Sequence, residues 1–180
     1  MKTRNTIASV AAAALLMLGL SSCDKNPLKV NLPMEFATIT FEIPVTPIAG
    51  PYVDSAEVTT NIDSLLSANK VKASNIKSIK IESLTFTCPE GDTLNNFRLV
   101  ESVKGDISKD SDSPVTVSEL NNNPNAASYF INMPVNTGTE YKNYLTGSTF
   151  KFKVTGNTRG PVTAPIIVTA KLKFNVEAGL

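Results

Sequence analysis

Alternation of apolar and polar positions is the main pattern along this chain of 180 residues. It is clearest in the C-terminal part, where apolar residues occupy every second position of 150–154 and of 166–176. Because successive side chains of a strand point to opposite faces, this period of two predicts strands with one buried face. We expect the two strands to pair as an antiparallel hairpin, although the connecting segment 156–165 is long for one.

Similar patterns recur upstream. Residues 35–45 predict a half-buried strand that a proline-rich stretch brings to an end. Residues 75–88 predict the longest strand, and their apolar positions change phase near Glu82-Ser83, which indicates a β-bulge. Shorter strands are expected at 55–60, 97–103, 115–117 and 128–135, short helices at 61–69 and 139–145, and a polar loop at 104–114.

Together these elements predict an all-β fold. About seven strands separated by turn signals are typical of a single antiparallel β-sandwich of the immunoglobulin-like type, here with one or two short helices. The predicted sandwich domain spans 34–180, and the sequence shows neither an internal repeat nor a second domain.

The N-terminus carries an apolar run of a different kind. Lys2 and Arg4 precede 14 almost entirely apolar residues at 7–20. A membrane-spanning helix needs about 20 such residues, so this run predicts the core of a signal peptide. The residues that follow, Leu20-Ser21-Ser22-Cys23, resemble the lipobox of bacterial lipoproteins, in which a branched apolar residue and two small residues precede a cysteine.

The lipobox resemblance implies removal of residues 1–22, a diacylglyceryl group on the Cys23 thiol and acylation of the new amine. Two or more acyl chains anchor a protein stably, since each buried methylene contributes about 0.8 kcal/mol. Residues 23–33 would form the lipidated tether. The expected location is the outer membrane of the cell envelope. The residues after the cysteine, Asp24-Lys25, do not distinguish an orientation toward the periplasm from one toward the cell surface.

A wider resemblance covers most of 34–178. The strand pattern IKSIKIESLTFT, a short helix before it, and the closing LTGSTFKFKVTG…PIIVTAKLKFNVEA resemble small lipoproteins of the Bacteroidota type. The resemblance implies a single β-sandwich in the cell envelope and supplies no catalytic residue.

Composition narrows the chemistry. The chain has no histidine, which argues against Ser-His-Asp and Cys-His catalysis and against the usual zinc sites. It also has no tryptophan, the side chain that stacks best on a sugar or a quaternary amine. We expect no cofactor. With Cys23 lipidated, Cys88 has no disulfide partner, and its apolar surroundings predict a buried small hydrophobe. The mature 158 residues hold 15 basic and 16 acidic side chains, so nucleic acid is not an expected partner.

Two groups are candidates for ligand binding. Lys151, Lys153, Lys171 and Lys173 would share the outer face of the final hairpin. They would hold an anionic glycan or lipopolysaccharide phosphates, or else form a solvated face that discourages edge aggregation. Tyr141 and Tyr144 would stack on a sugar as a pair, or else pack against the sandwich.

Three acidic residues, Asp106, Asp110 and Asp112, are weak metal candidates because they fall in one predicted loop. Oxygen-rich loops bind calcium, but this spacing is not that of an EF-hand. The alternative is a solvated loop.

These features favour a non-catalytic binding or accessory module that is anchored to the membrane through Cys23 and binds a glycan or another envelope protein. An alternative is an adhesin or pilus component that assembles by strand donation. A small hydrolase is a third hypothesis, and the missing histidine argues against it.

Overall fold

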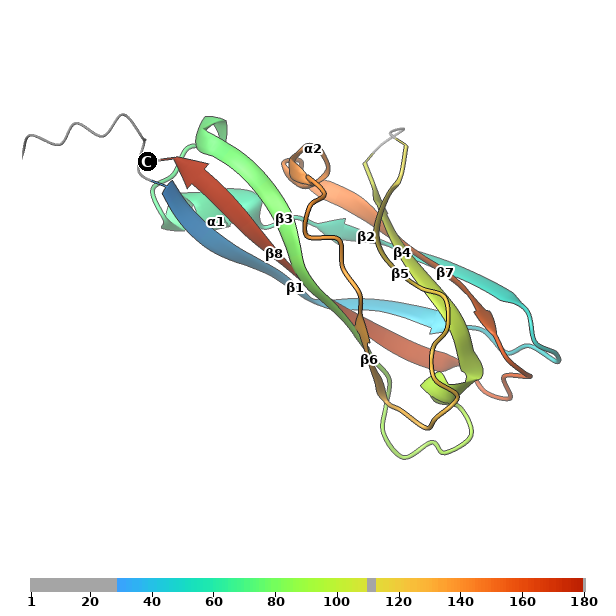
Figure 1. Ribbon diagram of the computed structural model, residues 1–180. Coiled ribbons are helices and arrows are strands. Elements are labelled where there is room, and N and C mark those ends of the chain that lie inside the picture. The colour runs from blue at the N-terminus through green and yellow to red at the C-terminus, as the bar shows by residue number, and fades with distance from the viewer. Residues whose placement is uncertain (1–28, 110–112, 180) are drawn as a thin grey trace, which may run out of the picture.

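The computed structural model describes residues 29–109 and 113–179, apart from the side chains of residues 37 and 38. Within this part of the chain, eight strands form two four-stranded sheets that pack face to face (Figure 1). The predicted all-β sandwich with two short helices is therefore confirmed.

Every strand pair within the two sheets is antiparallel. The first sheet contains, in spatial order, β1 (Lys29–Ile43), β8 (Ile166–Gly179), β3 (Ile76–Thr87) and β6 (Phe130–Met133). The second contains β2 (Pro51–Thr59), β7 (Thr149–Thr158), β4 (Val100–Ser108) and β5 (Val115–Leu120). The helices are α1 (Ile62–Ala68) and α2 (Lys142–Leu145), with 3₁₀ turns at Ala73–Asn75 and Phe97–Leu99.

The core lies between the sheets and is filled by the apolar face of each strand. Along β8 this face is buried over the whole strand, at Ile166, Val168, Ala170, Leu172, Phe174, Val176 and Ala178. Phe36 of β1 meets Phe150 of β7 edge to face, with ring centroids 5.2 Å apart, so this pair joins the two sheets. Burial of each such ring stabilises the fold by about 1.5–3 kcal/mol.

The predicted bulge in β3 is present. The register against β8 shifts between Ile81 and Ser83, so the buried positions change from odd numbers to even ones. A second bulge, which the sequence analysis did not predict, lies in β1 between Phe36 and Ile39. Both bulges keep apolar side chains in the core while the strand changes phase.

The predicted C-terminal hairpin is wrong. β7 pairs with β2 and β4, whereas β8 pairs with β1 and β3, so the connection between them crosses from one sheet to the other. Two half-buried strands can bury their apolar faces either as neighbours in one sheet or in two sheets that face each other across the core. Both arrangements produce the same alternation of apolar and polar residues, so the alternation does not tell which strands pair.

Two boundaries also differ from the expectation. Residues 29–33, expected in the tether, belong to β1, where Leu32 is buried and pairs with Val176. Residues 104–108, expected in a loop, belong to β4, and Ile107 there is fully buried. Pairing with β7 and β5 on both sides outweighs the low strand propensity of Gly105 and Asp106.

Cys88 follows β3 and is buried, as expected. Burial raises the pKa of its thiol, which therefore stays protonated as a small hydrophobe. None of the helices in the described ranges is both long and apolar enough to span a bilayer.

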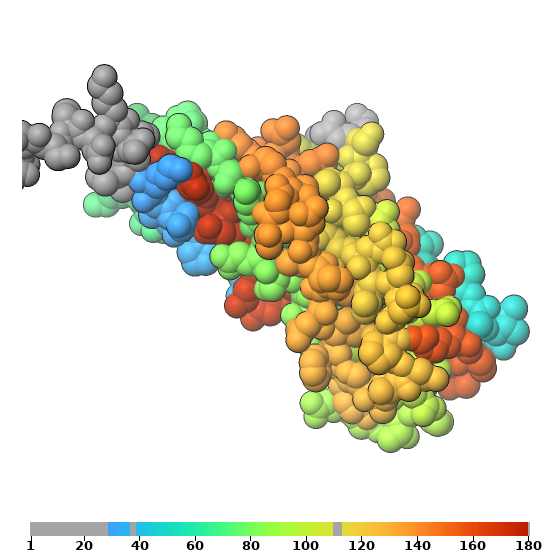
Figure 2. Space-filling view, in the orientation of Figure 1, coloured from blue at the N-terminus to red at the C-terminus, as the bar shows by residue number. Residues whose placement is uncertain are grey.

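The segment between β5 and α2 closes one side of the sandwich (Figure 2). Val135 forms an isolated bridge with Ser118 of β5, at the edge of the second sheet. Further along, the backbone N–H of Tyr141 donates to the Ile79 carbonyl of β3 at 2.8 Å. The segment thus connects the two sheets and carries Tyr141 into the core.

Candidate functional site

A groove of about 560 Å³ lies on the outer face of the second sheet. The register places Val53, Thr155, Lys104 and Glu119 in one row across β2, β7, β4 and β5. The lining residues are Pro51, Tyr52, Val53, Ser102, Val103, Lys104, Glu119, Asn121, Lys153, Thr155, Gly156 and Asn157. The groove therefore needs all four strands of the sheet.

Small polar side chains on the two central strands leave room for the groove. Asn157 of β7 donates its amide N–H to the Ser102 hydroxyl of β4 at 3.2 Å, and Thr155 lies two residues away. The longer side chains of Lys104, Lys153 and Glu119 line the same groove. A ligand there would meet hydroxyl, amide and carboxylate groups together with two ammonium groups.

Tyr52 supports this part of the sheet from the core side. It is buried, and its hydroxyl donates to the Ser102 carbonyl at 3.3 Å. Gly156 lies next to both groups: a Cβ there would be 2.5 Å from the Tyr52 hydroxyl oxygen and 2.1 Å from that carbonyl oxygen. Burial raises the pKa of the Tyr52 hydroxyl, which remains a neutral donor.

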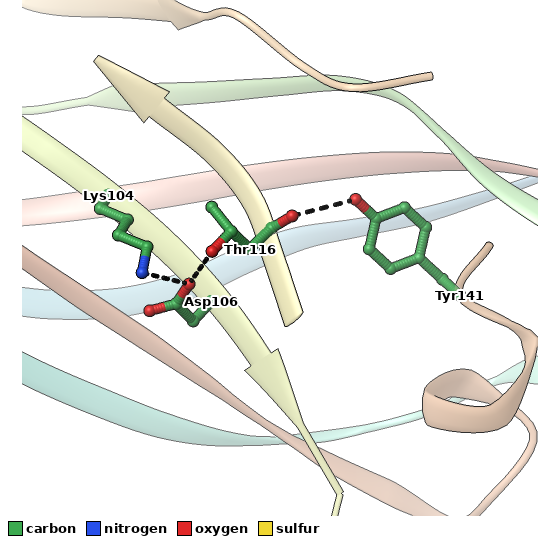
Figure 3. Close-up of polar contacts among 4 residues, drawn as sticks. All are labelled: Lys104, Asp106, Thr116 and Tyr141. Carbon is green, nitrogen blue, oxygen red and sulfur yellow. Dashed lines mark hydrogen bonds and ion pairs between the residues drawn. The ribbon is translucent and has the colours of Figure 1, made fainter. Parts of the chain in front are cut away.

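A chain of polar contacts connects the groove with the core (Figure 3). The ammonium nitrogen of Lys104 lies 3.2 Å from Asp106 Oδ1, and the Thr116 hydroxyl donates to the same oxygen at 2.8 Å. From the core, the Tyr141 hydroxyl donates to the Thr116 carbonyl at 3.5 Å. Asp106 is buried, so its carboxylate holds Lys104 in place at the groove.

The predicted strip of four lysines does not exist. Lys153 lines the groove, and Lys151 lies on the same face opposite Glu57 of β2. Lys171 and Lys173 belong to the other sheet, where both bind the Glu35 carboxylate, at 2.7 and 3.4 Å. The hydrogen bond from Lys171 is the main cause that lowers the pKa of Glu35. The two lysines of β7 lie apart from the two of β8 because these strands belong to different sheets.

The two tyrosines do not form an exposed stacking pair. Tyr141 is fully buried, and its ring meets Phe174 edge to face with centroids 5.6 Å apart. Tyr144 is half-buried, and its hydroxyl donates to the Ser113 carbonyl at 3.3 Å. Packing against the sandwich, the alternative interpretation, is correct for both tyrosines, since Tyr144 is partly buried against the core as well.

The acidic loop is also corrected. Asp106 lies in β4 rather than in a loop, and its Oδ1 is used by Lys104 and Thr116. Asp110 and Asp112 lie outside the described residues. Within the described ranges, no cluster of three or more histidine, cysteine, aspartate or glutamate side chains is placed to hold a metal ion.

Most of the groove residues were not predicted from the sequence. Of its lining residues, only Lys153 was a candidate. The available signal was the run Thr155-Gly156-Asn157, which continues an alternating strand with small polar residues. Its neighbours on β4, from Ser102 to Lys104, and on β5, at Glu119, are more than 30 residues away in sequence, so no local pattern joins them.

No protein-family model matches this sequence, and no curated protein matches it. Function is therefore inferred from the chemistry of the groove and from the N-terminal residues.

Proposed function

We propose that this protein is a lipid-anchored lipoprotein of the cell envelope whose sandwich is a non-catalytic binding module, with a glycan as its ligand. The lipobox at Leu20–Cys23 supports the anchor. The groove on the second sheet supports the binding role, because polar side chains from β7, β4 and β5 meet there around an open volume, with an apolar wall from β2.

The groove chemistry suits a sugar chain. Sugar hydroxyls both donate and accept hydrogen bonds, as do the side chains of Ser102, Thr155 and Asn157. Glu119 and Lys104 add charged partners that form stronger hydrogen bonds. Pro51 and the 60 % exposed Val53 offer an apolar wall for the C–H face of a sugar ring.

The carboxylates around the groove support a binding role over a hydrolytic one. Glycoside hydrolysis uses two carboxyl groups about 5–10 Å apart, one on each side of the scissile bond. Among the lining residues Glu119 is the one carboxylate. The carboxylate of Asp106, which contacts the groove residue Lys104, is buried and is held by Lys104 and Thr116.

Filling the groove is expected to abolish glycan binding. Thr155→Trp places a large side chain in the middle of the groove, and we expect about a tenfold or greater loss of affinity, which is about 1.4 kcal/mol or more. The measurement is calorimetry of the detergent-solubilised lipidated protein with the polysaccharide that binds best in an array of envelope and host glycans.

The matched control is Thr169→Trp, at a half-buried threonine on the central strand of the opposite sheet. It adds the same side chain and should leave binding unchanged. Equal affinity of both variants would place the glycan elsewhere, and an array without any saturable binder would contradict a glycan as the ligand.

The anchor is tested at its own residue. Cys23→Ser removes the thiol that would form the thioether, so we expect complete loss of label from a clickable palmitate analogue, while the wild type is labelled. Protease treatment of intact cells then separates the two orientations, since a surface-exposed domain is digested and a periplasmic one is protected. Equal labelling of wild type and variant would refute the lipoprotein assignment.

A further inference from the structure

Several elements meet at one end of the sandwich. Lys29, the first residue of β1, pairs with Gly179 at the end of β8, and Ile76 at the start of β3 pairs with Ala178. The helix α1 and the turn that follows it lie at the same end (Figure 1). We call this the proximal end, because the residues that precede β1 join the domain here.

The proximal end is rich in lysine. Lys70 and Lys72 are exposed in the connection between α1 and β3. Lys77 is exposed at the second residue of β3, and its Cε lies 3.5 Å from the position that a Cβ on Gly179 would take. None of these three forms an ion pair with another described residue. Their ammonium groups therefore face solvent.

Nearby carboxylates compensate only part of this charge. Glu177 is paired with Lys29 at 2.8 Å, and Glu140 accepts the backbone N–H groups of Ile79 and Lys142. Asp63 lies in the first turn of α1. The proximal end thus keeps an excess of positive charge.

The opposite, distal end has a different character. Its loops expose apolar side chains, with Val45, Ile48 and Leu94 at 55 %, 72 % and 62 %. The groove extends toward this end, since Pro51 opens β2 there and pairs with Asn157. Charge and ligand groove therefore lie toward opposite ends of the molecule.

We infer that Lys70, Lys72 and Lys77 hold the proximal end against anionic phospholipid headgroups of the membrane that anchors the protein. The inference rests on the proposed acylation of Cys23. Five residues lie between Cys23 and Lys29, and the six residue-to-residue steps of an extended chain span at most about 20 Å. This tether keeps the lysines close to the bilayer.

The lysines attract the membrane once the tether has brought the proximal end close to it. Attraction of lysines to an anionic leaflet falls off within a Debye length, about 8 Å at physiological ionic strength. The contact orients the sandwich with its groove and distal loops directed away from the membrane, where a glycan can reach them.

The test uses lipidated full-length protein in vesicles of phosphatidylcholine, with or without phosphatidylglycerol. A fluorophore is attached at Ser74→Cys, beside the lysines, or at the distal Asn125→Cys, both exposed positions. Nitroxide groups on the lipid headgroups quench a fluorophore that lies close to them. In anionic vesicles we expect about twofold or greater extra quenching at position 74, none at position 125, and reversal by high salt.

Two double variants separate the proximal lysines from a general charge effect. Lys72→Gln with Lys77→Gln should remove the extra quenching, whereas Lys151→Gln with Lys153→Gln, which changes the net charge equally, should leave it. Extra quenching that survives the first pair, or appears at position 125, overturns the inference. Flotation of the vesicles is scored separately, because protein that fails to float with them refutes the lipid anchor itself.

Discussion

Replacement of Gly156 by alanine is expected to destabilise the sandwich by about 2–4 kcal/mol, at or above the usual cost of an added methyl group in a packed interior. A Cβ at this position would lie 2.1 Å from the Ser102 carbonyl oxygen and 2.5 Å from the Tyr52 hydroxyl. The first of these atoms belongs to the backbone of β4 and cannot rotate away.

The strain has two consequences. β4 must move away from β7, which weakens their pairing, and Tyr52 must leave the position from which its hydroxyl donates to Ser102. The same movement alters the groove on the other face of these strands. Both stability and ligand affinity should therefore fall together.

Gly160→Ala is the matched control, because a Cβ at Gly160 meets no atom within 4 Å. Its effect on stability should stay within about 0.5 kcal/mol. Urea unfolding followed by circular dichroism measures both variants. If Gly156→Ala unfolds at the same midpoint as Gly160→Ala, the close approach of β4 and β7 at Gly156 is wrong.

Replacement of Asn123 by leucine should cost about 1–3 kcal/mol, the usual cost of a buried polar group left without its partner. The Asn123 amide donates to the carbonyls of Phe97 and Val100, at 2.7 and 3.0 Å. Both lie where the chain enters β4, and Asn123 itself is buried. Leucine fills a similar volume but donates to neither carbonyl. The Phe97 carbonyl still accepts the backbone N–H of Val100, so the Val100 carbonyl is the one that loses its side-chain partner.

Asn122→Leu provides the comparison, because the neighbouring Asn122 is exposed. We expect a change within about 0.5 kcal/mol there. Thermal unfolding of the two variants, recorded by circular dichroism, distinguishes the buried amide from a general effect of leucine in this loop. Similar melting temperatures would show that the Asn123 amide does not stabilise the start of β4.

The two substitutions concern the part of the fold that the proposed function needs. Asn123 secures the start of β4, and Gly156 sets the distance between β4 and β7. These two strands supply Ser102, Lys104, Thr155 and Asn157 to the groove. A rigid pairing keeps these groups in place for a ligand, so that little freedom is lost on binding.

The sequence alone predicted much of the secondary structure. The alternation along β3 and β8, the bulge near Glu82-Ser83, the short helices and the burial of Cys88 are all confirmed. Each depends on the order of apolar and polar residues within about a dozen positions, which is local information. The lipobox and the anchor at Cys23 stay predictions, since they lie outside the described residues.

The lysines show where local information ends. Lys153 and Lys171 occupy equivalent outward positions of two similar strands, yet one lines the groove and the other binds Glu35 on the opposite sheet. The alternation within a strand predicts that a side chain points outward, but the sheet to which that strand belongs depends on strand pairing. The sequence therefore predicted the exposure of these residues and not their neighbours.

Asp106 and Asn123 show the same limit for buried polar residues. Both lie in stretches that read as polar loops, and both are buried because partners on other elements contact them: Thr116 of β5 for Asp106, and the Phe97 and Val100 carbonyls for Asn123. Composition alone predicts that such residues stay in water. The sequence by itself thus determined most of the strand segments and which face of each is apolar, whereas the tertiary structure decided strand pairing, the ends of β1 and β4, the groove and these buried polar contacts, because each of them requires residues from separate elements to meet.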